Sequence, residues 1–499
     1  MPVPGPVLVV GAGPTGLVAA LLLARHGVEV IVVERRDGVH PLPRAVHLDD
    51  ESVRILQAAG VADGFTAVSR PAAGLRLLDA RLRPFAEFRR SESGLHGWPE
   101  SNLFDQPALE ELLRDAVAAQ PLVTLHEGVE VAGVEQRPDG LSVRLRTERG
   151  HGAVGHDGLA APTEGRPRPE TTISASAVLG CDGAHSTVRD LIGARMRDLG
   201  FTERWFVLDV ASSEPLPTWG GVDQVCDPAR AGTFLPLPGD RYRWEWRMHD
   251  GEDAADLAER IPELTARWTG AVDVDVLRAA EYTFAARLAD RWRDGRVFLL
   301  GDAAHLTPPF IGQGLGAGLR DAHNLAWKLV DALARPASAE ALLESYRLER
   351  APHAEAVIRG AVRVGRAMTG GPGAVAALRR PLVAGALRIP GVRARASRVL
   401  TTRFPAGESV DRRRHRRDLV GAHCPQVRIG DRRLDDVLGP GWALVTDGPV
   451  PDGLRARAER VGAGTVRVGE LGGWLAAGRA GAALLRPDRI VAATAPRPG

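Results

Sequence analysis

The sequence has few cysteines and no long apolar run, and each shortage excludes a class of protein. Its 499 residues include three cysteines, Cys181, Cys226 and Cys424, which lie far apart. This spacing excludes a disulfide-rich scaffold and a cysteine-based zinc site, and it favours a reducing cytoplasm. No apolar run approaches the ~20 residues of a membrane helix, and no basic stretch precedes the first apolar segment, as it would in a secretory signal. We therefore expect a cytoplasmic protein with no membrane partner.

The sequence also lacks an excess of charge of one sign. Its 64 basic residues are balanced by 62 acidic residues, and Lys328 is the single lysine. The arginines are spread along the whole chain, so we expect no nucleic-acid partner. Hydrophobic residues make up 44% and charged residues 25%, as in ordinary soluble proteins. The length allows roughly two to four domains.

The N-terminal 34 residues contain a dinucleotide-binding pattern. The apolar run Val7–Val10 predicts a buried strand, and a helix is expected over Leu17–His26 and a second strand over Val28–Glu34. Between the first strand and the helix lies a Gly-x-Gly-x-x-Gly motif. Its glycines allow a tight turn, a close approach of backbone to a pyrophosphate, and close packing of helix on strand. An acidic residue ends the second strand, where it can accept hydrogen bonds from ribose hydroxyls. The motif favours a dinucleotide without choosing between FAD and NAD.

Two further motifs follow predicted strands. The first is Gly180-Cys181-Asp182-Gly183, and the second is Gly301-Asp302, which leads into the proline- and glycine-rich segment 308–318 and then a helix. Aspartates at strand ends are common ligand contacts in α/β folds, although the same pair also occurs in ordinary turns. Glycines before a helix expose backbone N–H groups that favour negative charge.

Together the three motifs resemble those of the FAD-dependent aromatic hydroxylases, the single-component flavoprotein monooxygenases of the p-hydroxybenzoate hydroxylase superfamily. Other segments are similar to the 3-(3-hydroxyphenyl)propionate hydroxylase-like and polyketide-tailoring hydroxylases. These segments are Pro43–Val46, Asp49–Ser52, Asn102–Glu110, Asn324–Leu329 and Leu485–Ala492. The resemblance covers nearly the whole chain, and its motifs are more specific for the superfamily than for the substrate.

The resemblance implies noncovalently bound FAD, with NADH or NADPH as a transient electron donor. It assigns Glu34 to the adenosine ribose, Arg44 and Gln106 to the phosphate and adenosine side, Asp302 to the ribityl chain, and Asp182 to FAD and the nicotinamide donor. The 312–318 loop would lie against the flavin pyrimidine. The expected cofactor-binding residues are Gly11, Gly13, Pro14, Thr15, Gly16, Glu34, Arg35, Arg44, Gln106, Asp182, Asp302, Pro309, Gly312, Gly314, Leu315 and Gly316. Many relatives have Asn where this chain has Gly316, so that side-chain contact is absent here.

The substrate contacts are less clearly indicated. The resemblance puts His47 beside the ring-binding cavity, where it is either a catalytic proton-relay residue in contact with substrate or a structural histidine. The segment 241–248 alternates between charged and aromatic residues, which predicts a strand with one aromatic face. That face either packs in the core or lines the aromatic pocket. The expected substrate residues are His47, Trp219, Phe234, Tyr242, Trp244 and Trp246. His305 is expected to orient its loop.

The motif order predicts an α/β fold, with a Rossmann-like FAD-binding domain and an inserted α+β substrate domain, and the resemblance implies a C-terminal thioredoxin-like domain. The FAD-binding domain is expected to be discontinuous, over 1–75, 103–185 and 285–370, with the substrate domain over 76–102 and 186–284. A helical linker over 371–419 would lead to the thioredoxin-like domain at 420–499. Because that domain has only Cys424 and no cysteine pair, thiol–disulfide catalysis is excluded there.

The resemblance implies a monooxygenase that uses NAD(P)H and O2 to hydroxylate a phenolic or other electron-rich aromatic compound through a flavin C4a-hydroperoxide. Two alternatives remain: a Baeyer–Villiger or epoxidising monooxygenase acting on a polyketide, and a non-catalytic flavin-binding protein. A flavin halogenase is excluded because its lysine lies in the N-terminal half, and no lysine precedes Lys328. A simple NAD-dependent oxidoreductase would not explain the 301–318 motif. No metal is expected, and a homodimer is a further expectation.

Overall fold

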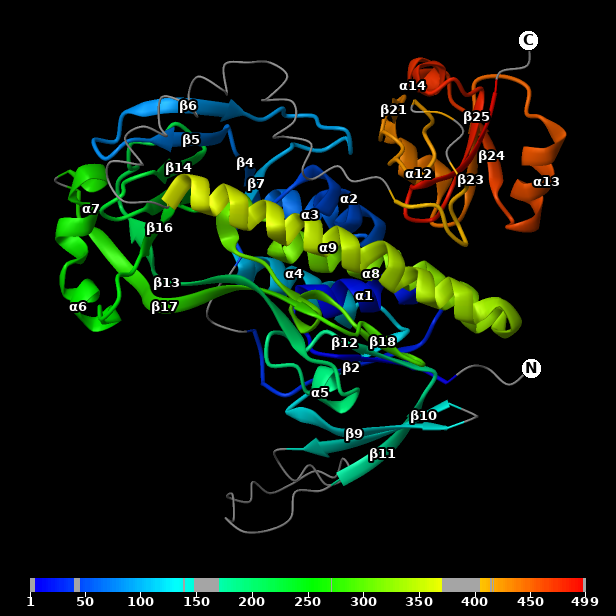
Figure 1. Ribbon diagram of the computed structural model, residues 1–499, viewed down its shortest axis with the longest axis horizontal. Helices are drawn as coiled ribbons and strands as arrows, with labels where there is room; N and C mark the ends of the chain where they lie inside the picture. Colours follow the sequence, from blue (N-terminus) through cyan, green and yellow to red (C-terminus); the bar gives the residue numbers. More distant parts are fainter. Residues whose placement is uncertain are drawn as a thin grey trace.

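The computed structural model describes residues 5–39, 45–137, 140–147, 170–270, 272–369, 404–412, 415 and 417–496 (Figure 1). Its first elements are β1 (Val7–Val10), α1 (Pro14–Arg25) and β2 (Val30–Glu34). This confirms the predicted strand–helix–strand unit. All four residues of β1 are buried, as expected for a parallel strand that is covered on both faces.

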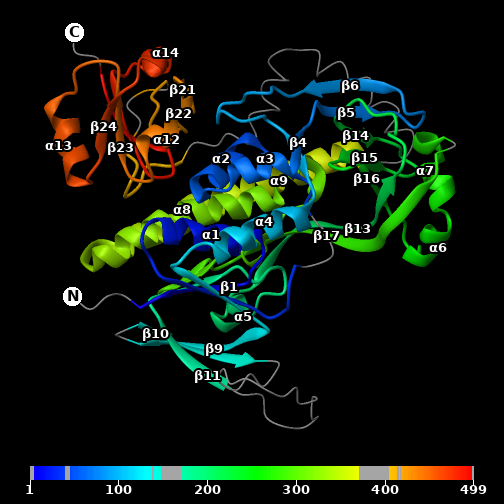
Figure 2. The ribbon, with the colours of Figure 1, turned by 180° about the vertical axis from the view of Figure 1, so that it is seen from behind.

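These strands belong to a six-stranded sheet with the order β18-β19-β12-β1-β2-β8. Its other strands are β8 (Val123–Glu127), β12 (Ala177–Gly180), β18 (Arg293–Asp294) and β19 (Val297–Leu299). Every pairing is parallel except that of β18 with β19. Helices α1, α4 (Gln106–Ala118) and α8 (Gly314–Ala334) lie on one side of it in both ribbon views (Figures 1 and 2).

On the other side lie a small antiparallel sheet and a short helix. They are β9 (Val129–Arg137), β10 (Gly140–Thr147), β11 (Glu170–Ala175) and α5 (Thr187–Leu191). The sheet order is β11-β10-β9. The largest hydrophobic cluster of the described residues lies between the parallel sheet and its covering layers.

A second large sheet has eight strands in the order β20-β17-β13-β16-β15-β14-β5-β6. Its strands are β5 (Gly74–Leu78), β6 (Pro84–Arg89), β13 (Met196–Ser212), β14 (Val222–Val225), β15 (Gly232–Leu237), β16 (Arg241–Arg247), β17 (Val274–Ala289) and β20 (His305–Leu306). Helices α6 (Ala254–Glu259) and α7 (Ile261–Thr269) pack on one of its faces. The long antiparallel pair β13 and β17 extends from this sheet towards the parallel one (Figure 1).

The remaining elements before residue 370 are short segments and one long helix. They are β3 (His47–Leu48), β4 (Ser69–Pro71), β7 (Asn102–Phe104), α2 (Asp50–Ala59), α3 (Ala62–Ala67), the 3-10 turns η1 (Gly301–Ala303), η2 (Pro309–Ile311) and η3 (Pro336–Ser338), and the helix α9 (Ala339–Thr369). The helix α9 packs along α8 and reaches β17, and Pro352 lies inside it.

The C-terminal part forms a separate sheet beside α2 (Figure 2, orange to red). Its elements are β21 (Arg428–Ile429), β22 (Arg432–Arg433), α12 (Leu434–Leu438), β23 (Ala443–Thr446), α13 (Asp452–Arg460), β24 (Gly464–Arg467), η5 (Gly469–Leu471), α14 (Gly472–Ala477), β25 (Ala482–Leu485) and β26 (Val491–Ala495). Four strands pair in the order β24-β23-β25-β26, with β23 parallel to β24 and the other pairs antiparallel. This part has its own hydrophobic clusters.

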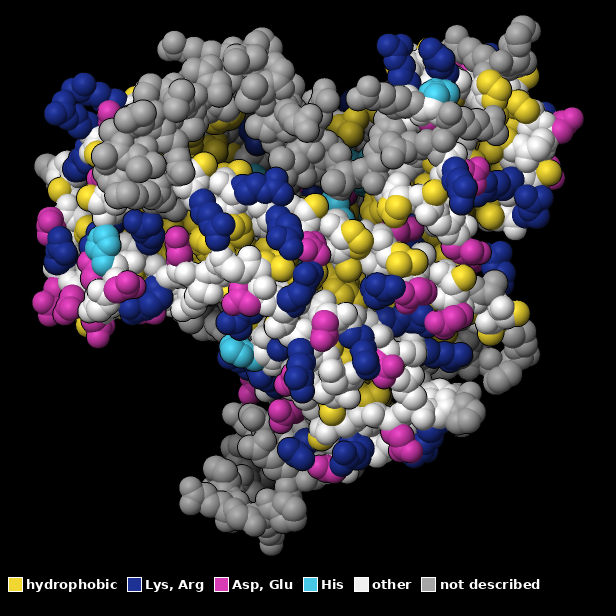
Figure 3. Space-filling model, in the orientation of Figure 1, with side chains coloured by type: hydrophobic (Ala, Val, Ile, Leu, Met, Phe, Trp, Pro, Cys, Tyr) yellow, Lys and Arg dark blue, Asp and Glu magenta, His cyan; other side chains and the backbone are white. Residues whose placement is uncertain are grey.

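The face of the molecule in Figure 3 carries basic and acidic side chains that are interspersed over most of its described area. Among the described helices, none has the length and hydropathy needed to cross a bilayer. Much of the predicted linker, residues 371–403, lies outside the described part of the chain.

Candidate active site

A cavity of about 1140 Å³ lies where the carboxyl ends of the parallel strands meet the eight-stranded sheet. Its wall includes Val10 of β1, Glu34 of β2, Asp182 after β12 and Asp302 after β19. The carboxyl edge of a parallel sheet is the usual ligand site of α/β folds. The volume exceeds the ~300–1,000 Å³ of a pocket for one drug-sized ligand, so a dinucleotide and a small substrate can share it.

The glycine turn between β1 and α1 has the geometry that its sequence predicts. Gly11 has φ +103°, and a Cβ there would lie 2.5 Å from the carbonyl oxygen of Cys181. A Cβ at Gly16 would lie 2.0 Å from the oxygen of Gly11, so only glycine lets the helix approach the strand this closely. Gly13 differs, because a Cβ there would meet no atom within 4 Å, and the residue lines the cavity together with Pro14 and Thr15. The space beside Gly13 is therefore open for a ligand at the start of α1.

The carboxylate of Glu34 lies directly beside this turn. It accepts hydrogen bonds from the backbone N–H groups of Ala12, at 2.9 Å, and Arg36, at 3.0 Å. Arg35 also lines the cavity. Gln106, at the start of α4, accepts from the N–H of Ala45 at 2.8 Å. Arg44 lies outside the described residues.

Asp182 is anchored to the start of the short helix α5. It accepts a hydrogen bond from the Ser186 hydroxyl at 2.5 Å and one from the Val188 N–H at 3.0 Å. Ser186 in turn caps α5, because its hydroxyl accepts from the N–H of Arg189. Burial raises the pKa of Asp182. This carboxylate lines the cavity from a rigid position.

Asp302 lines the cavity from a turn whose preceding residue, Gly301, is hydrogen-bonded to Asp321 of α8. The carboxylate of Asp321 accepts the N–H of Gly301 at 3.0 Å and pairs with Nε2 of His305 at 2.8 Å and Nε of Arg350 at 2.8 Å. The side chains of His305 and Asp321 are completely buried. His305 is not among the residues that line the cavity. The expected loop-orienting role of His305 stays a prediction.

The loop that leads into α8 lies on the cavity wall through Pro309, Gly312, Gly314 and Leu315. Gly312 has φ +60°, and a Cβ there would lie 2.8 Å from Nδ1 of His47. Gly316 is not part of the wall. A Cβ at that position would lie 2.8 Å from Oγ of Ser52 and 2.9 Å from Nη1 of Arg320, so the residue faces the packed layer beneath the loop. The cofactor-binding role expected for Gly316 stays a prediction.

His47 lines the cavity and bridges two segments. Its Nδ1 lies 3.3 Å from the carbonyl oxygen of Gly312, and its Nε2 lies 2.9 Å from Oγ of Ser101. Because a carbonyl can only accept, Nδ1 carries the proton, and Nε2 accepts from the Ser101 hydroxyl. Burial lowers the pKa of His47, with a smaller opposing contribution from Asp49. The imidazole is therefore neutral near pH 7.

The structure does not bring the expected aromatic substrate residues to the cavity wall. The side chains of Phe234, Tyr242, Trp244 and Trp246 pack in a hydrophobic cluster with α6 and α7, on the far face of the eight-stranded sheet. The physical reason is strand alternation: successive residues of β16 point to opposite faces, and its aromatic face is the one that the helices cover. Trp219 also lies off the wall, with its ring 4.6 Å from the guanidinium carbon of Arg76.

The opposite face of β16 lines the cavity with Arg243 and Glu245. Arg243 forms a bidentate pair with Asp209 at 2.6 and 3.0 Å. Burial raises the pKa of Glu245. The sequence signal was present in the charged residues that alternate with the aromatic ones, but it did not indicate which face meets the cavity.

The aromatic wall of the cavity comes from residues that the sequence did not single out. They are Phe85, Phe88, Trp205, Tyr282, Phe284 and Phe310. The ring of Phe310 lies 5.8 Å from that of Trp205, edge to face, and Tyr282 stacks on Phe284 at 6.1 Å. The Tyr282 hydroxyl is buried and has no hydrogen-bond partner among the described residues. The i, i+2 spacing of Tyr282 and Phe284 is the one signal in the sequence that could have indicated this wall.

Comparisons with known proteins show the family of this chain. The family model described as "FAD binding domain" matches residues 5–361. The chain is 36% identical over 486 residues to 3-(3-hydroxy-phenyl)propionate/3-hydroxycinnamic acid hydroxylase 2 of Burkholderia vietnamiensis, which covers 93% of this chain and 84% of the relative. It is 30% identical to a probable NADH-specific resorcinol 4-hydroxylase of Rhodococcus jostii, which covers 97% and 91%.

A solved structure of aklavinone-11 hydroxylase, in a ternary complex with FAD and aklavinone, superposes with a TM-score of 0.78 at 27% identity. The match covers 99% of this chain and 96% of that one. These matches confirm the expected resemblance and establish that this chain belongs to the FAD binding domain family, with FAD as its cofactor and the FAD-dependent hydroxylases as its relatives.

Proposed function

We propose that this protein hydroxylates a phenolic or other electron-rich aromatic compound, with FAD, NAD(P)H and O2. The observation that carries the proposal is the single cavity that both sheets line. The dinucleotide-binding turn, Asp182 and Asp302 lie along its parallel-sheet side, and an aromatic wall lies on its other side. A hydroxylase needs this arrangement, because oxygen must pass from the cofactor to a ring held beside it in a site that excludes water.

The cavity residues fit FAD. The open space beside Gly13 and the start of α1 suit the pyrophosphate, and Glu34, which accepts from the N–H of Ala12, lies beside this turn for the ribose. Asp302 would hold the ribityl chain, and Gly312, Gly314 and Leu315 would face the ring. FAD supplies electron transfer from NAD(P)H and activation of O2. The protein supplies binding, orientation and a dry cavity.

We further propose that His47 accepts the substrate proton through Ser101. The Ser101 hydroxyl also lines the cavity, and it already donates to Nε2 of His47. When a phenol gives its proton to Ser101, the serine proton moves to Nε2, and the imidazole becomes cationic with Nδ1–H still donating to Gly312. Ionising the phenol makes its ring more electron-rich, so this step assists oxygen transfer.

The polar side of the aromatic wall suggests how the substrate is recognised. A buried hydroxyl without a partner costs roughly 1–3 kcal/mol, and the Tyr282 hydroxyl is such a group among the described residues. We propose that it bonds an oxygen substituent of the substrate. Trp205, Phe284 and Phe310 would hold the ring itself.

The division of the chain into domains is part of the same proposal. The parallel sheet would be the core of the FAD-binding domain over 1–75, 103–185 and 285–370, and the eight-stranded sheet the core of the substrate domain over 76–102 and 186–284. A thioredoxin-like domain over 420–499 is supported by the β24-β23-β25-β26 order and its parallel β23–β24 pair. We also propose a cytoplasmic location, since Cys181, Cys226 and Cys424 are free thiols. A homodimer remains a proposal.

The proposal is tested by flavin release and by turnover. Heat-released cofactor should be FAD, and phenolic acids or polyketide phenols should stimulate oxidation of NADH or NADPH. Release of FMN would remove the role given to the glycine turn and Glu34. Bound FAD without stimulated oxidation by any phenol would favour a non-catalytic flavin-binding protein.

A further inference from the structure

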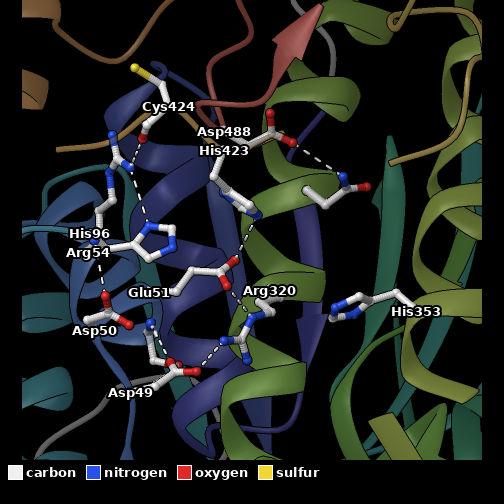
Figure 4. Close-up of polar contacts among 12 residues, drawn as sticks. Asp49, Asp50, Glu51, Arg54, His96, Arg320, His353, His423, Cys424 and Asp488 are labelled. Carbon is white, nitrogen blue, oxygen red and sulfur yellow. Dashed lines mark hydrogen bonds and ion pairs between the residues drawn. The ribbon is translucent and has the colours of Figure 1, made fainter. Parts of the chain in front are cut away.

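A cluster of buried charges lies beneath the loop that faces the cavity (Figure 4). It consists of Asp49 and Glu51 at the start of α2 and Arg320 in the second turn of α8. None of the three lines the cavity. The figure shows the Arg320 guanidinium between the two carboxylates. Neither the expected cofactor contacts nor the proposed proton transfer uses this cluster.

The guanidinium of Arg320 has three partners. Its Nη2 donates to Oδ2 of Asp49 at 2.5 Å, and its Nε lies 2.9 Å from Oε2 of Glu51. Its Nη1 donates to the side-chain oxygen of Gln313 at 2.9 Å. Gln313 directly follows Gly312 and is the N-cap residue of α8. Arg320 therefore ties the start of α2 to the loop at the start of α8.

The partners of Arg320 are themselves fixed. Asp49 caps α2, because its Oδ1 accepts the N–H of Ser52 at 2.9 Å and the Ser52 hydroxyl at 2.7 Å. The Gln313 side chain is buried, with 2% of its surface exposed. The loop is thus held at two consecutive residues: at Gly312 by His47 from the cavity side, and at Gln313 by Arg320 from beneath.

The charge of Arg320 is needed where it lies. Burial by itself would raise the pKa of Glu51, but the charge and hydrogen bond of Arg320, together with His423 and His96, outweigh burial and hold that pKa well below its ordinary range. Removing the guanidinium would leave two buried carboxylates side by side, which is strongly unfavourable. The arginine at this position therefore neutralises both acids and also contacts Gln313.

The C-terminal part covers this cluster on the side of α2. Nε2 of His423 lies 3.5 Å from Oε1 of Glu51. On the next turn of α2, Arg54 pairs with Asp435 at 2.6 Å and donates to the carbonyl oxygen of Cys424 at 2.7 Å. These contacts keep water from the cluster without reaching the cavity.

We propose that Arg320 is a positioning residue that holds the Gly312–Leu315 loop in the conformation that receives the flavin ring. It acts through Gln313, and it touches neither cofactor nor substrate. The inference rests on the proposed function, because the loop is taken there to face the flavin.

An arginine that only stabilised the fold would not change the 311–316 loop specifically. Arg293 provides the control for this comparison. Arg293 is as buried as Arg320, with 5% against 7% of its side chain exposed, and it also pairs with two carboxylates, Glu340 and Glu344. It lies on the edge strand β18 and does not line the cavity. Its two carboxylates are more exposed than those of Arg320, at 83% and 35% against 11% and 16%, so Arg293 matches Arg320 in the burial of the guanidinium itself.

The test compares Arg320→Lys with Arg293→Lys by amide hydrogen exchange of the flavin-free protein and by FAD titration. Lysine keeps the charge but cannot serve three partners, because it lacks the planar fork. We expect exchange over residues 311–316 to become about tenfold faster, and FAD binding about tenfold weaker, in Arg320→Lys alone. Gln313→Met, which leaves both ion pairs intact, should loosen the same peptides if Arg320→Lys fails to fold.

Equal exchange over 311–316 in the parent, Gln313→Met and Arg320→Lys, with only a lower melting temperature, would overturn the inference. So would faster loop exchange in Arg293→Lys. Because the exchange measurement needs neither flavin nor substrate, it stands even if no phenol is hydroxylated. Failure of the proposed function and failure of this inference are therefore distinguishable.

Discussion

Nδ1 of His47 lies 3.3 Å from the carbonyl oxygen of Gly312, and this contact joins His47 to the loop at the start of α8. The contact fixes the tautomer, because the carbonyl requires a proton on Nδ1. It leaves Nε2 as the basic nitrogen, directed at Ser101. The chemistry proposed for this histidine depends on that orientation.

His47→Ala should keep FAD and still oxidise NAD(P)H, but release more hydrogen peroxide for each product formed. Loss of a general base slows the hydroxylation step by roughly 10²–10⁴-fold, and by less if water substitutes. The ratio of product to NAD(P)H consumed measures this effect. Ser101→Ala should change the ratio in the same direction. If His47→Ala couples as well as the parent from about pH 5 to pH 9, a range that extends below the ordinary histidine pKa of about 6.5, then His47 only packs.

Asp302→Ala should weaken FAD retention. A charged acceptor for a ribityl hydroxyl contributes roughly 1.5–3 kcal/mol, so the dissociation constant should rise by about 10- to 150-fold. Titration of the flavin-free protein with FAD measures it. Asp302→Asn keeps an acceptor without the charge and should give an intermediate value. An unchanged affinity in both variants would make Asp302 a turn residue only.

The N-terminal part of the site could be predicted because its determinants are local. Gly11, Gly16 and Glu34 follow one another within a single strand–helix–strand unit, and their spacing alone specifies the turn. Which face of β16 lines the cavity could not be predicted in the same way. Alternation separates Trp244 from Arg243, but the choice of face depends on α6 and α7 packing on one side and Asp209 pairing on the other.

Tyr282→Phe should raise the KM for substrate, because Tyr282 lines the cavity and the variant removes the buried, unpartnered hydroxyl that is proposed to bond the substrate. A single hydrogen bond contributes roughly 0.5–1.5 kcal/mol, so the change should be about two- to tenfold. Tyr242→Phe is the matched control, since its hydroxyl accepts from the N–H of Leu216 at 2.9 Å on the far face of the sheet. Steady-state kinetics should show the effect in Tyr282→Phe alone, and equal KM values in both variants would remove the proposed contact.

The buried contacts of α8 could not be predicted because their partners come from distant parts of the sequence. The helix carries Arg320, Asp321, Asn324 and Lys328 among apolar residues, which indicates a buried polar surface. Their partners are distant in the sequence: Asp49 lies 271 residues from Arg320, and Glu349 lies 21 residues from Lys328. Only the assembled fold brings such groups together. The roles of Asp321 and Arg320 were missed on this account.

Asp50 should make stability fall as the pH rises. Burial, with the nearby charge of Asp49, raises the pKa of Asp50 to about 7, whereas the unfolded chain has the ordinary value of about 3.9. The folded protein therefore binds the proton more tightly between these values. The contribution is fully present below about pH 4 and is lost as the pH rises through about 7.

Asp50→Asn removes this titration and keeps an acceptor for the N–H of His96, which lies 3.1 Å from Oδ2. Relative to the parent, the variant should be more stable at pH 8 by roughly 1–3 kcal/mol after allowance for partial exposure. At pH 5 the difference should be smaller, about a third of that at pH 8. Denaturant unfolding at both pH values measures it, and an equal gain at pH 5 and pH 8 would show that charge is not the cause.

The central claim, transfer of oxygen from O2 to an aromatic ring, is tested most directly by product mass under isotopically labelled oxygen. The protein, FAD, NADH or NADPH and the phenol that best stimulates oxidation are incubated under 18O2, and the product is analysed by mass spectrometry. The account predicts a hydroxylated ring that carries one 18O atom for each molecule of substrate converted. Oxidation of NAD(P)H with labelled hydrogen peroxide as the only product, or a product whose new oxygen comes from water, would contradict it.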